Sequence, residues 1–347
     1  MAYYSSFLIN KNKLLNNFDN LKSKNICAMV KANAYGCGLE AVCKTLFGKA
    51  KFFGVANLQE ALQIRAFDKY SPILIVGISG DFLIAIQNNI SIAIDNENQI
   101  NYIINLYKNN IINKKIKIHI KINSGMNRLG INNKKELKNI LKLIKNNKFI
   151  NFEGIFSHFS TADCDQVFFN KQLKKFDEFV KLIPPIFNPI KHIGGSAVLQ
   201  NIDIKKYNDY MFRIGIDLYA TPNSIIKVKS QIIKILELEA GERVGYSNGY
   251  ICDKKTKIAV VPLGYADGVN RKLGNKGYVK IKNKKCGIVG NVCMDMFFAD
   301  ITNFDFQIGD IVLVFENANS WGKICNTIPY EILTSLNYAR MDYIIEN

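Results

Sequence analysis

The first two thirds of the chain alternate short apolar segments with longer amphipathic ones. Runs rich in isoleucine and valine are typical of strands, and helical segments such as LEAVCKTLF and NLQEALQIRAF separate most of them. The strand candidates are residues 26–30, 52–56, 73–77, 91–95, 115–122, 151–157, 190–194 and 214–220. Eight strands in alternation with helices predict a parallel (β/α)8 barrel. A doubly wound open sheet is the alternative, but no GxGxxG loop supports dinucleotide binding.

The pattern changes after about residue 225. Strand-like runs such as KIAVVPLGY, YVKIKN, KCGIVGNV and DIVLVFE follow one another with turns between them, and helical periodicity is scarce before YEILTSL. This texture predicts a second, mostly β domain. A chain of 347 residues is long enough for two domains, which we place at residues 1–225 and 226–347.

Composition narrows the class of protein. The eight cysteines are scattered without a CxxC pair, so we expect reduced thiols and no metal site. No apolar run is long enough for a membrane span, and the first residues lack the features of a signal peptide, so we expect a cytoplasmic chain. The net charge of +17 raises the alternative of nucleic-acid binding, but lysine is spread along the whole chain beside asparagine and isoleucine. We therefore expect solvated helix faces, whose charge also attracts anionic metabolites.

Several reactive side chains lie within or beside the predicted strands. Lys31 ends the apolar run of the first strand, where an ammonium is costly unless it is solvated, paired or used. His158 and Arg213 belong to the segments of later strands, and His192 precedes a Gly-Gly-Ser turn that is a plausible phosphate cradle. Barrel enzymes place reactive groups at the carboxyl ends of their strands. The remaining histidine, His119, lies inside a predicted strand and is expected to be structural.

Nine segments share the residues and the order of one enzyme family. They are AMVKANAYGCG, KINSGMNRLG, GIFSHFSTAD, HIGGSA, FRIGI, VGYSNGY, PLGYADG, NVCMDM and YEIL. In these segments the chain resembles the alanine racemases, which are pyridoxal-phosphate-dependent enzymes of fold type III. The resemblance runs nearly from end to end. It implies an enzyme that interconverts L-alanine and D-alanine and so supplies D-alanine for peptidoglycan synthesis.

The resemblance also implies which residues do the chemistry. Lys31 forms a Schiff base with pyridoxal 5'-phosphate and, once the substrate amine displaces it, acts as a base on one face of the substrate. Tyr246 is the base on the other face. In the family this tyrosine comes from the partner subunit of a head-to-tail homodimer, as do the residues that match Tyr265 and Met294 near the substrate.

Further roles follow from the same resemblance. The phosphate-binding positions are Tyr35, Ser196, Gly215, Ile216 and Tyr330. Arg213 faces the pyridine nitrogen with support from His192, while His158 lies beside the ring and hydrogen-bonds Tyr246. Arg128 helps to hold the substrate carboxylate, and Lys121 occupies a position that is often carbamylated, which would orient Arg128.

The chain departs from the family pattern at a few positions. Cys37 replaces the usual histidine, Asn123 replaces an aspartate, and Gly195 replaces an asparagine. The segment ARMD near the C-terminus lacks a proline and an arginine of the usual motif. These changes leave open a racemase that also accepts serine or other small amino acids. A non-catalytic carrier of pyridoxal phosphate is the other alternative, although the β domain and Tyr246 argue against it.

Overall fold

The computed structural model describes residues 4–77, 80–221 and 224–347, and the chain forms two compact units. One unit comprises Asn20–Ala34 and Val42–Gly215, and we call it the barrel unit. The other comprises the described residues of Met1–Asp19, Tyr35–Ala41 and Ile216–Asn347, and we call it the β unit.

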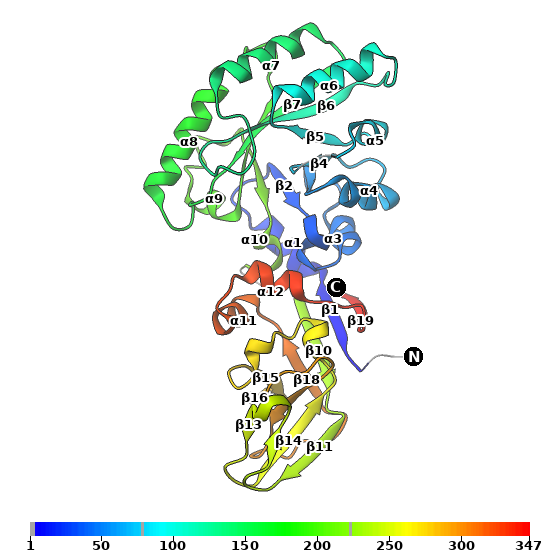
Figure 1. The fold of residues 1–347 in the computed structure, drawn as a ribbon, viewed down its shortest axis with the longest axis vertical. Coiled ribbons are helices and arrows are strands. Elements are labelled where there is room, and N and C mark those ends of the chain that lie inside the picture. The colour runs from blue at the N-terminus through cyan, green and yellow to red at the C-terminus, as the bar shows by residue number, and fades with distance from the viewer. Residues whose placement is uncertain (1–3, 78–79, 222–223) are drawn as a thin grey trace. The chain divides into compact units, whose positions relative to one another are not determined.

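Eight parallel strands of the barrel unit close into a ring in sequence order (Figure 1). They are β2 (Ile26–Met29), β3 (Phe52–Val55), β4 (Ile73–Ile75), β5 (Ser91–Ile94), β6 (Ile116–Ile122), β7 (Ile150–His158), β8 (Ile190–Gly194) and β9 (Met211–Ile214). Strands β2, β3 and β5 are buried along their whole length, as expected for parallel strands that are covered on both faces. The predicted (β/α)8 barrel is confirmed.

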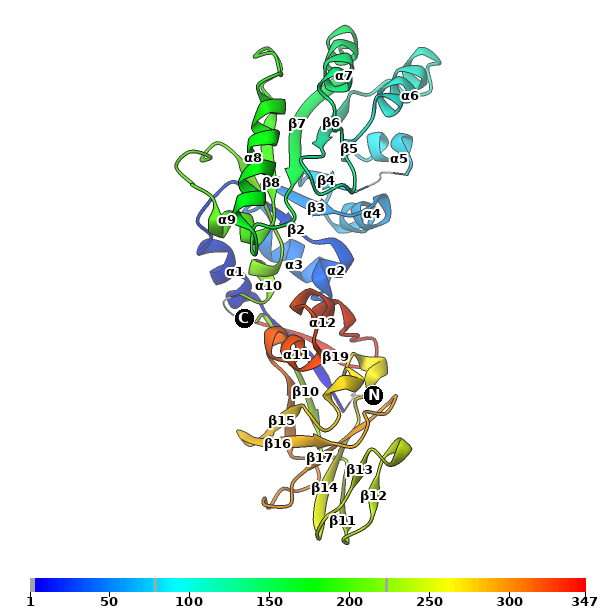
Figure 2. The ribbon, with the colours of Figure 1, turned by 60° about the vertical axis from the view of Figure 1, so that its left-hand side comes forward.

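Helices lie outside the barrel strands (Figures 1 and 2). They are α3 (Leu39–Leu46), α4 (Leu58–Phe67), α5 (Phe82–Gln87), α6 (Glu97–Lys108), α7 (Lys134–Asn146), α8 (Gln166–Val180) and α9 (Ser196–Asn201). Helices α4 to α8 each follow an asparagine or aspartate whose side chain accepts a hydrogen bond from the first helical turn. Helix α7 buries a stripe formed by Leu137, Ile140, Leu141 and Ile144.

The prediction for the eighth strand is wrong. We expected a strand at 214–220, but β9 ends at Ile214, and residues Ile216–Tyr219 form helix α10. The strand begins earlier and includes Arg213, which is only 4% exposed. A buried arginine contradicts the apolar pattern on which strand prediction depends, whereas the apolar run after it is equally compatible with a short buried helix.

The β unit is built on one nine-stranded sheet with the order β11-β14-β17-β16-β15-β18-β10-β1-β19. Its strands are β1 (Ser6–Asn10), β10 (Ile226–Gln231), β11 (Lys234–Leu238), β14 (Thr256–Val261), β15 (Tyr278–Ile281), β16 (Lys284–Val289), β17 (Phe297–Asp300), β18 (Ile311–Phe315) and β19 (Asp342–Glu346). A small separate sheet pairs β12 (Arg243–Val244) with β13 (Tyr250–Ile251). The mostly β character predicted after residue 225 is confirmed.

Short helices complete the β unit. They are α1 (Lys11–Asp19), α10, α11 (Ala318–Cys325) and α12 (Pro329–Ser335), together with the 3-10 turns η1 (Tyr246–Asn248), η2 (Tyr265–Asp267) and η3 (Arg271–Leu273). Strand β1 was not predicted from the sequence. It pairs antiparallel with β10 and parallel with β19, so the start and the end of the chain share one sheet. The predicted limits of the two domains, 1–225 and 226–347, stay a prediction.

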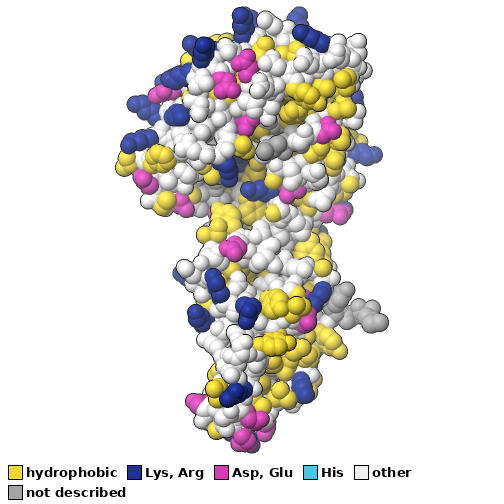
Figure 3. Space-filling view, in the orientation of Figure 1, with side chains coloured by type: hydrophobic (Ala, Val, Ile, Leu, Met, Phe, Trp, Pro, Cys, Tyr) yellow, Lys and Arg dark blue, Asp and Glu magenta, His cyan; other side chains and the backbone are white. Residues whose placement is uncertain are grey.

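The surface is rich in cations without a single basic stripe on the face drawn in Figure 3. There, lysine and arginine side chains are scattered and interspersed with acidic ones. Among the helices of the described residues, none has the length and apolar character that crossing a membrane requires.

Candidate active site

The carboxyl ends of the barrel strands bring several predicted residues together. Lys31 comes two residues after β2 ends, His158 is the last residue of β7, and Arg213 lies near the end of β9. Gly194 pairs with both His158 and Arg213 in the sheet register. A Cβ atom on Gly194 would lie 2.2 Å from Arg213 Nη2 and 2.7 Å from His158 Nδ1, so only glycine lets these side chains approach.

Lys31 begins a turn of unusual handedness. Helix α2 (Lys31–Tyr35) is a short helical turn in which Ala32, Asn33, Ala34 and Tyr35 all have φ between 51° and 58°. Left-handed backbone costs L residues roughly 1–2 kcal/mol each. Strain of this kind persists only where the surroundings fix it, and it is concentrated at functional sites.

Glu60 is one of the groups that fix this turn. Its carboxylate accepts hydrogen bonds of 2.7 Å from the backbone N–H of Ala32 and, through its other oxygen, 2.7 Å from that of Ala56. Glu60 lies in the first turn of α4, where its backbone N–H donates to the side chain of the capping residue Asn57. Sequence reasoning missed this residue, because an acidic residue in a first helical turn is already explained by the helix dipole.

The ammonium of Lys31 is half-buried among charges. Burial lowers its pKa, the nearby Arg128 cation lowers it further, and the Glu60 carboxylate acts in the opposite direction. The neutral amine is therefore more accessible at Lys31 than at an exposed lysine. A neutral amine is the form that attacks a carbonyl carbon or accepts a proton.

Lys121, Arg128 and His158 line one small pocket together with Asn123 and Met126. Burial and the charge of Arg213 lower the pKa of Lys121 to about 8. Lys121 Nζ donates to the carbonyl oxygen of Val76 at 3.0 Å. Burial and the same arginine lower the pKa of His158 to about 3, so this imidazole is neutral at physiological pH.

Arg213 is held by hydrogen-bond acceptors. Its Nη2 donates to the carbonyl oxygen of Ser157 at 2.6 Å, and its Nη1 donates to His192 Nδ1 at 3.1 Å and to the His192 carbonyl oxygen at 3.2 Å. Its guanidinium carbon also lies 4.8 Å from the centre of the Phe156 ring. Arg213 and His192, which were predicted as partners, are thus brought together.

The predicted phosphate-binding residues are divided between the two units. Ser196 begins α9 in the barrel unit after Gly195, whose φ of 110° suits glycine, and Ser196 is 4% exposed. Gly215 ends the barrel unit, whereas Ile216, Tyr35 and Tyr330 belong to the β unit. There the ring of Tyr35 lies 5.9 Å from that of Tyr330.

Loops of the β unit bring the other predicted residues together. The side chain of Asn291 donates to the carbonyl oxygen of Tyr246 at 2.9 Å. The backbone N–H of Tyr265 donates to the carbonyl oxygen of Cys293 at 3.0 Å, and that of Ala266 to the carbonyl oxygen of Met294 at 3.1 Å.

Tyr246, Tyr265 and Met294 project from these loops. They are 69%, 43% and 52% exposed within one chain. Large apolar or aromatic side chains that gather at a surface without cover are typical of an interface.

Arg340 joins two of these loops, and sequence reasoning missed it. Its guanidinium donates to both carboxylate oxygens of Asp267, at 2.9 and 3.0 Å, and to Asp295 at 2.6 Å. Asp267 is 1% exposed and follows Tyr265 closely, while Asp295 adjoins Met294. The ARMD segment departs from the family motif, but its arginine joins the loops that carry two predicted substrate residues.

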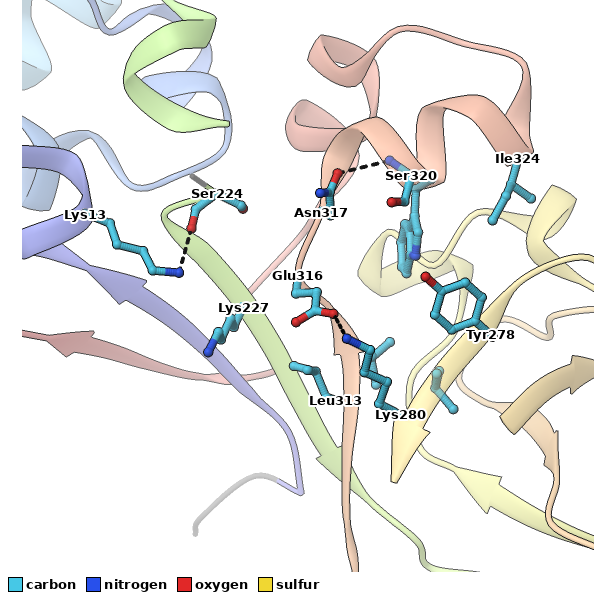
Figure 4. A pocket seen from close by; sticks show the side chains of 13 residues that line it. Lys13, Ser224, Lys227, Tyr278, Lys280, Leu313, Glu316, Asn317, Ser320 and Ile324 are labelled. Carbon is cyan, nitrogen blue, oxygen red and sulfur yellow. Dashed lines mark hydrogen bonds and ion pairs between the residues drawn. The ribbon is translucent and has the colours of Figure 1, made fainter. Parts of the chain in front are cut away.

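A cavity of about 280 Å³ lies elsewhere in the β unit and contains none of the predicted residues (Figure 4). Three lysines and one glutamate line it, but Lys280 is paired with Glu316, and Lys13 Nζ donates to the carbonyl oxygen of Ser224 at 3.3 Å. Two of its ammonium groups therefore already have a protein partner.

Comparison with known protein families shows which family the chain belongs to. Residues 9–222 match the model of the alanine racemase N-terminal domain, and residues 225–344 match that of the C-terminal domain. The chain belongs to the alanine racemase family. This membership confirms the predicted family and the predicted class of enzyme, an amino-acid racemase.

Relatives of this family align with nearly the whole chain. An alanine racemase of Helicobacter pylori (strain Shi470) is 32% identical over 97% of this chain and 98% of its own length. One of Francisella philomiragia is 34% identical over 95% of this chain and 96% of its own length.

Solved structures of alanine racemases have the same fold. That of Clostridium difficile 630 has a TM-score of 0.90 and 31% identity, with 99% of this chain and 96% of that chain covered. The alanine racemase of Bartonella henselae, described with covalently bound pyridoxal phosphate, has a TM-score of 0.87 and 27% identity, with 99% of this chain and 100% of that chain covered.

Proposed function

We propose that this chain interconverts L-alanine and D-alanine with pyridoxal 5'-phosphate as its cofactor and with Lys31 and Tyr246 as its two bases. The observation that carries the proposal is the Lys31 amine at the end of a barrel strand, on a left-handed turn, with a pKa lowered by burial and by Arg128. The Bartonella henselae relative holds pyridoxal phosphate covalently, and a lysine amine is the group that bonds this cofactor's carbonyl carbon.

The residues of this chain fit the cofactor in chemistry. Lys31 supplies the amine, and the donor-only guanidinium of Arg213 suits an acceptor such as a pyridine nitrogen. The phosphate is held by Tyr35, Ser196, Gly215, Ile216 and Tyr330. When bound, the cofactor withdraws electrons and so stabilises the negative charge left at the substrate's α-carbon.

Two bases on opposite faces exchange the proton of the α-carbon. Lys31 Nζ accepts the proton from one face, and the Tyr246 hydroxyl delivers a proton to the other, with the roles reversed in the opposite direction. His158, which is neutral because burial and Arg213 lower its pKa to about 3, lies beside the ring and positions Tyr246 by a hydrogen bond.

Arg213 restrains the chemistry as well as binding the ring. A guanidinium keeps its proton even though burial lowers the pKa of Arg213 to about 10. Facing the pyridine nitrogen of the bound cofactor, it would donate a hydrogen bond without giving up its proton. Arg213 would thereby limit side reactions such as transamination.

The substrate carboxylate is held by Arg128, with Met294 and Tyr265 near the substrate entrance. Lys121 carries a carbamate that orients Arg128. Its pKa of about 8 supports this role, because carbon dioxide reacts with a neutral amine.

The working form is a homodimer in the cytoplasm that shares its active sites between subunits. The exposure of Tyr246, Tyr265 and Met294 supports a shared site, and eight free cysteines are compatible with a reducing compartment. The D-alanine formed supplies peptidoglycan synthesis.

Incubation of the protein with pyridoxal phosphate and L-alanine in D2O tests the proposal. NMR follows the loss of the α-proton, and chiral separation follows D-alanine. We expect both deuterium uptake and D-alanine from the wild type, and neither from Lys31→Ala.

Controls and rival outcomes separate the alternatives. Tyr246→Phe should abolish D-alanine formation, whereas Tyr70→Phe, at a tyrosine that is 84% exposed, should not. Turnover of serine or another small amino acid at a rate similar to that of alanine would replace the proposal by a broader racemase. Bound cofactor without exchange of any small amino acid would replace it by the carrier alternative.

A further inference from the structure

A continuous chain of hydrogen bonds extends from Arg213 to Glu153, a residue near the start of β7. His192 Nδ1 accepts from Arg213 at 3.1 Å, and His192 Nε2 lies 2.8 Å from His119 Nδ1. His119 Nε2 lies 2.9 Å from a carboxylate oxygen of Glu153. Both histidines are fully buried, and Glu153 is partly exposed. The sequence prediction placed His192 beside Arg213 but gave no role to Glu153 and only a structural one to His119.

The direction of this chain is fixed at both ends. A guanidinium has only donors, so Arg213 requires His192 Nδ1 to be an acceptor. His192 then carries its proton on Nε2 and donates to His119 Nδ1. His119 in turn carries its proton on Nε2 and donates to Glu153, whose ionised carboxylate has only acceptors. Any other tautomer, or a protonated imidazole, would set two donors against each other.

The protonation of the three groups agrees with this direction. Burial lowers the pKa of both His119 and His192, so neither ring is charged at neutral pH. Glu153 also accepts from the hydroxyl of Ser91, and its other oxygen lies 4.0 Å from Lys117 Nζ. Hydrogen bonds from His119 and Ser91 hold the pKa of Glu153 below its usual value despite burial.

The backbone is built around this chain. In the register of β6 and β7, Ile118 pairs with Phe152 and His119 pairs with Gly154, which leaves Glu153 as an extra, bulged residue. A bulge re-aims a side chain, here toward His119. A Cβ atom on Gly154 would lie 2.2 Å from His119 Nδ1, so glycine makes room for the ring. The His192 ring is stacked on Phe156 at 4.7 Å.

The row of hydrogen bonds also links the buried Arg213 cation to the Glu153 anion. Arg213 is 4% exposed, and in the described part of the chain no carboxylate is paired with it directly. Glu153 is the carboxylate at the far end of its hydrogen-bonded path. Polarisation along such a path strengthens each bond in it, so the charge of Glu153 makes His192 Nδ1 a better acceptor for Arg213.

We propose that Glu153 and His119 are positioning residues that act through His192 to fix the orientation and donor strength of the Arg213 guanidinium. The effect on catalysis rests on the proposed function, in which Arg213 faces the ring nitrogen of the cofactor. The direction of the hydrogen-bond chain does not depend on that function.

The first test is the tautomeric state of the histidines in the wild-type holoenzyme. The protein has only three histidines, so 15N-histidine labelling gives a spectrum that can be fully assigned. The signals of His158 and His192 are identified by their loss in His158→Asn and His192→Asn. We expect His119 and His192 both to be neutral with the proton on Nε2. A proton on Nδ1 of either ring would overturn the proposal, and this test needs no variant at Glu153.

The second test is Glu153→Gln, which removes the charge but keeps the size. We expect kcat for alanine to fall about 10- to 100-fold with little change in KM, as for other partners that orient a reactive group indirectly. The 15N signals of His192, which Glu153 does not touch, should also move. A loss of thermal stability with unchanged kcat and unchanged His192 signals would show a merely structural glutamate and overturn the proposal.

Two matched controls define the effect. Glu178→Gln removes a carboxylate that pairs with Lys134 at 2.8 Å on the surface. Lys117→Gln removes the lysine beside Glu153 but keeps the hydrogen bonds from Arg213 to Glu153. Neither should change kcat or the tautomers of the histidines. If the wild type does not racemise alanine, the proposed function fails. The tautomers of His119 and His192 still decide whether the hydrogen bonds run in the inferred direction from Arg213 to Glu153.

Discussion

Positively charged side chains gather at the carboxyl end of the barrel. Lys31, Lys121 and Arg128 lie near Arg213, and each of these lysines has its pKa lowered by burial and by the neighbouring guanidinium groups. Such a cluster is costly for an empty pocket and favourable for one that binds a phosphate and a carboxylate. The same charges that attract anions therefore also keep neutral amines available for chemistry.

Lys121 should carry a carbamate. With a pKa of about 8, roughly one amine in ten is neutral at pH 7, and the fraction rises toward pH 8. We expect a carbamate signal in the 13C NMR spectrum of holoenzyme equilibrated with 13C-bicarbonate, stronger at pH 8 than at pH 7. The signal should vanish in Lys121→Arg and persist in Lys117→Arg. A signal that survives in Lys121→Arg would contradict the assignment.

At the scale of elements, the left-handed turn after β2 depends on the first turn of α4. Removing the Glu60 carboxylate in Glu60→Ala should lower the free energy of unfolding by about 2 kcal/mol, because two backbone N–H groups lose a charged acceptor. Urea unfolding measures this loss, and the fraction of chain with covalently bound cofactor should fall with it.

Glu136→Ala is the matched control, because Glu136 occupies the same position in α7 behind an asparagine cap. Its carboxylate accepts from the N–H of Glu97 at 3.2 Å and does not touch the turn. Equal losses in the two variants would mean that Glu60 stabilises only its own helix.

Arg340 should act on the loops of Tyr265 and Met294. In Arg340→Met the buried Asp267 loses its bidentate partner, so we expect a loss of about 2 kcal/mol in unfolding free energy. The KM for alanine should rise, since the two loops near the substrate are no longer joined. The exposed Arg271→Met serves as the control. Steady-state kinetics with KM unchanged in Arg340→Met would remove Arg340 from the site.

Strand prediction succeeded where the pattern of apolar residues was undisturbed and failed where function interrupts it. Strands β2 to β8 were found because runs of isoleucine, valine and phenylalanine stand between helical segments. Strand β9 was misplaced because Arg213 lies within it, and β1 was missed because its partners β10 and β19 are distant in the sequence.

The site residues also differ in how far the sequence reveals them. Lys31 is recognisable from its motif, and its position at the end of a barrel strand is confirmed. Glu60, Glu153 and Arg340 escaped notice because their importance depends on contacts across long sequence separations or on a bulge. No local pattern reports such contacts, so only the folded chain reveals them.

At the scale of the whole molecule, the exposure of Tyr246 supports the proposed sharing of sites between subunits. Lys31 belongs to the barrel unit and Tyr246 to the β unit, and Tyr246 is 69% exposed in the single chain. A tyrosine base needs a site that excludes water, since desolvation strengthens the electrostatic interactions on which proton transfer depends. A second copy of the chain would provide that cover through a symmetric interface.

Mixing two inactive variants tests this arrangement. Lys31→Ala and Tyr246→Phe should each be inactive alone. If each site takes Lys31 from one subunit and Tyr246 from the other, a mixed dimer has one intact site, so random exchange of subunits at equal amounts should restore about one quarter of the wild-type activity. A site contained within one chain predicts no recovery, because every chain lacks one base. Mixing Lys31→Ala with the double variant Lys31→Ala/Tyr246→Phe should stay inactive, which makes recovery specific to a restored pair.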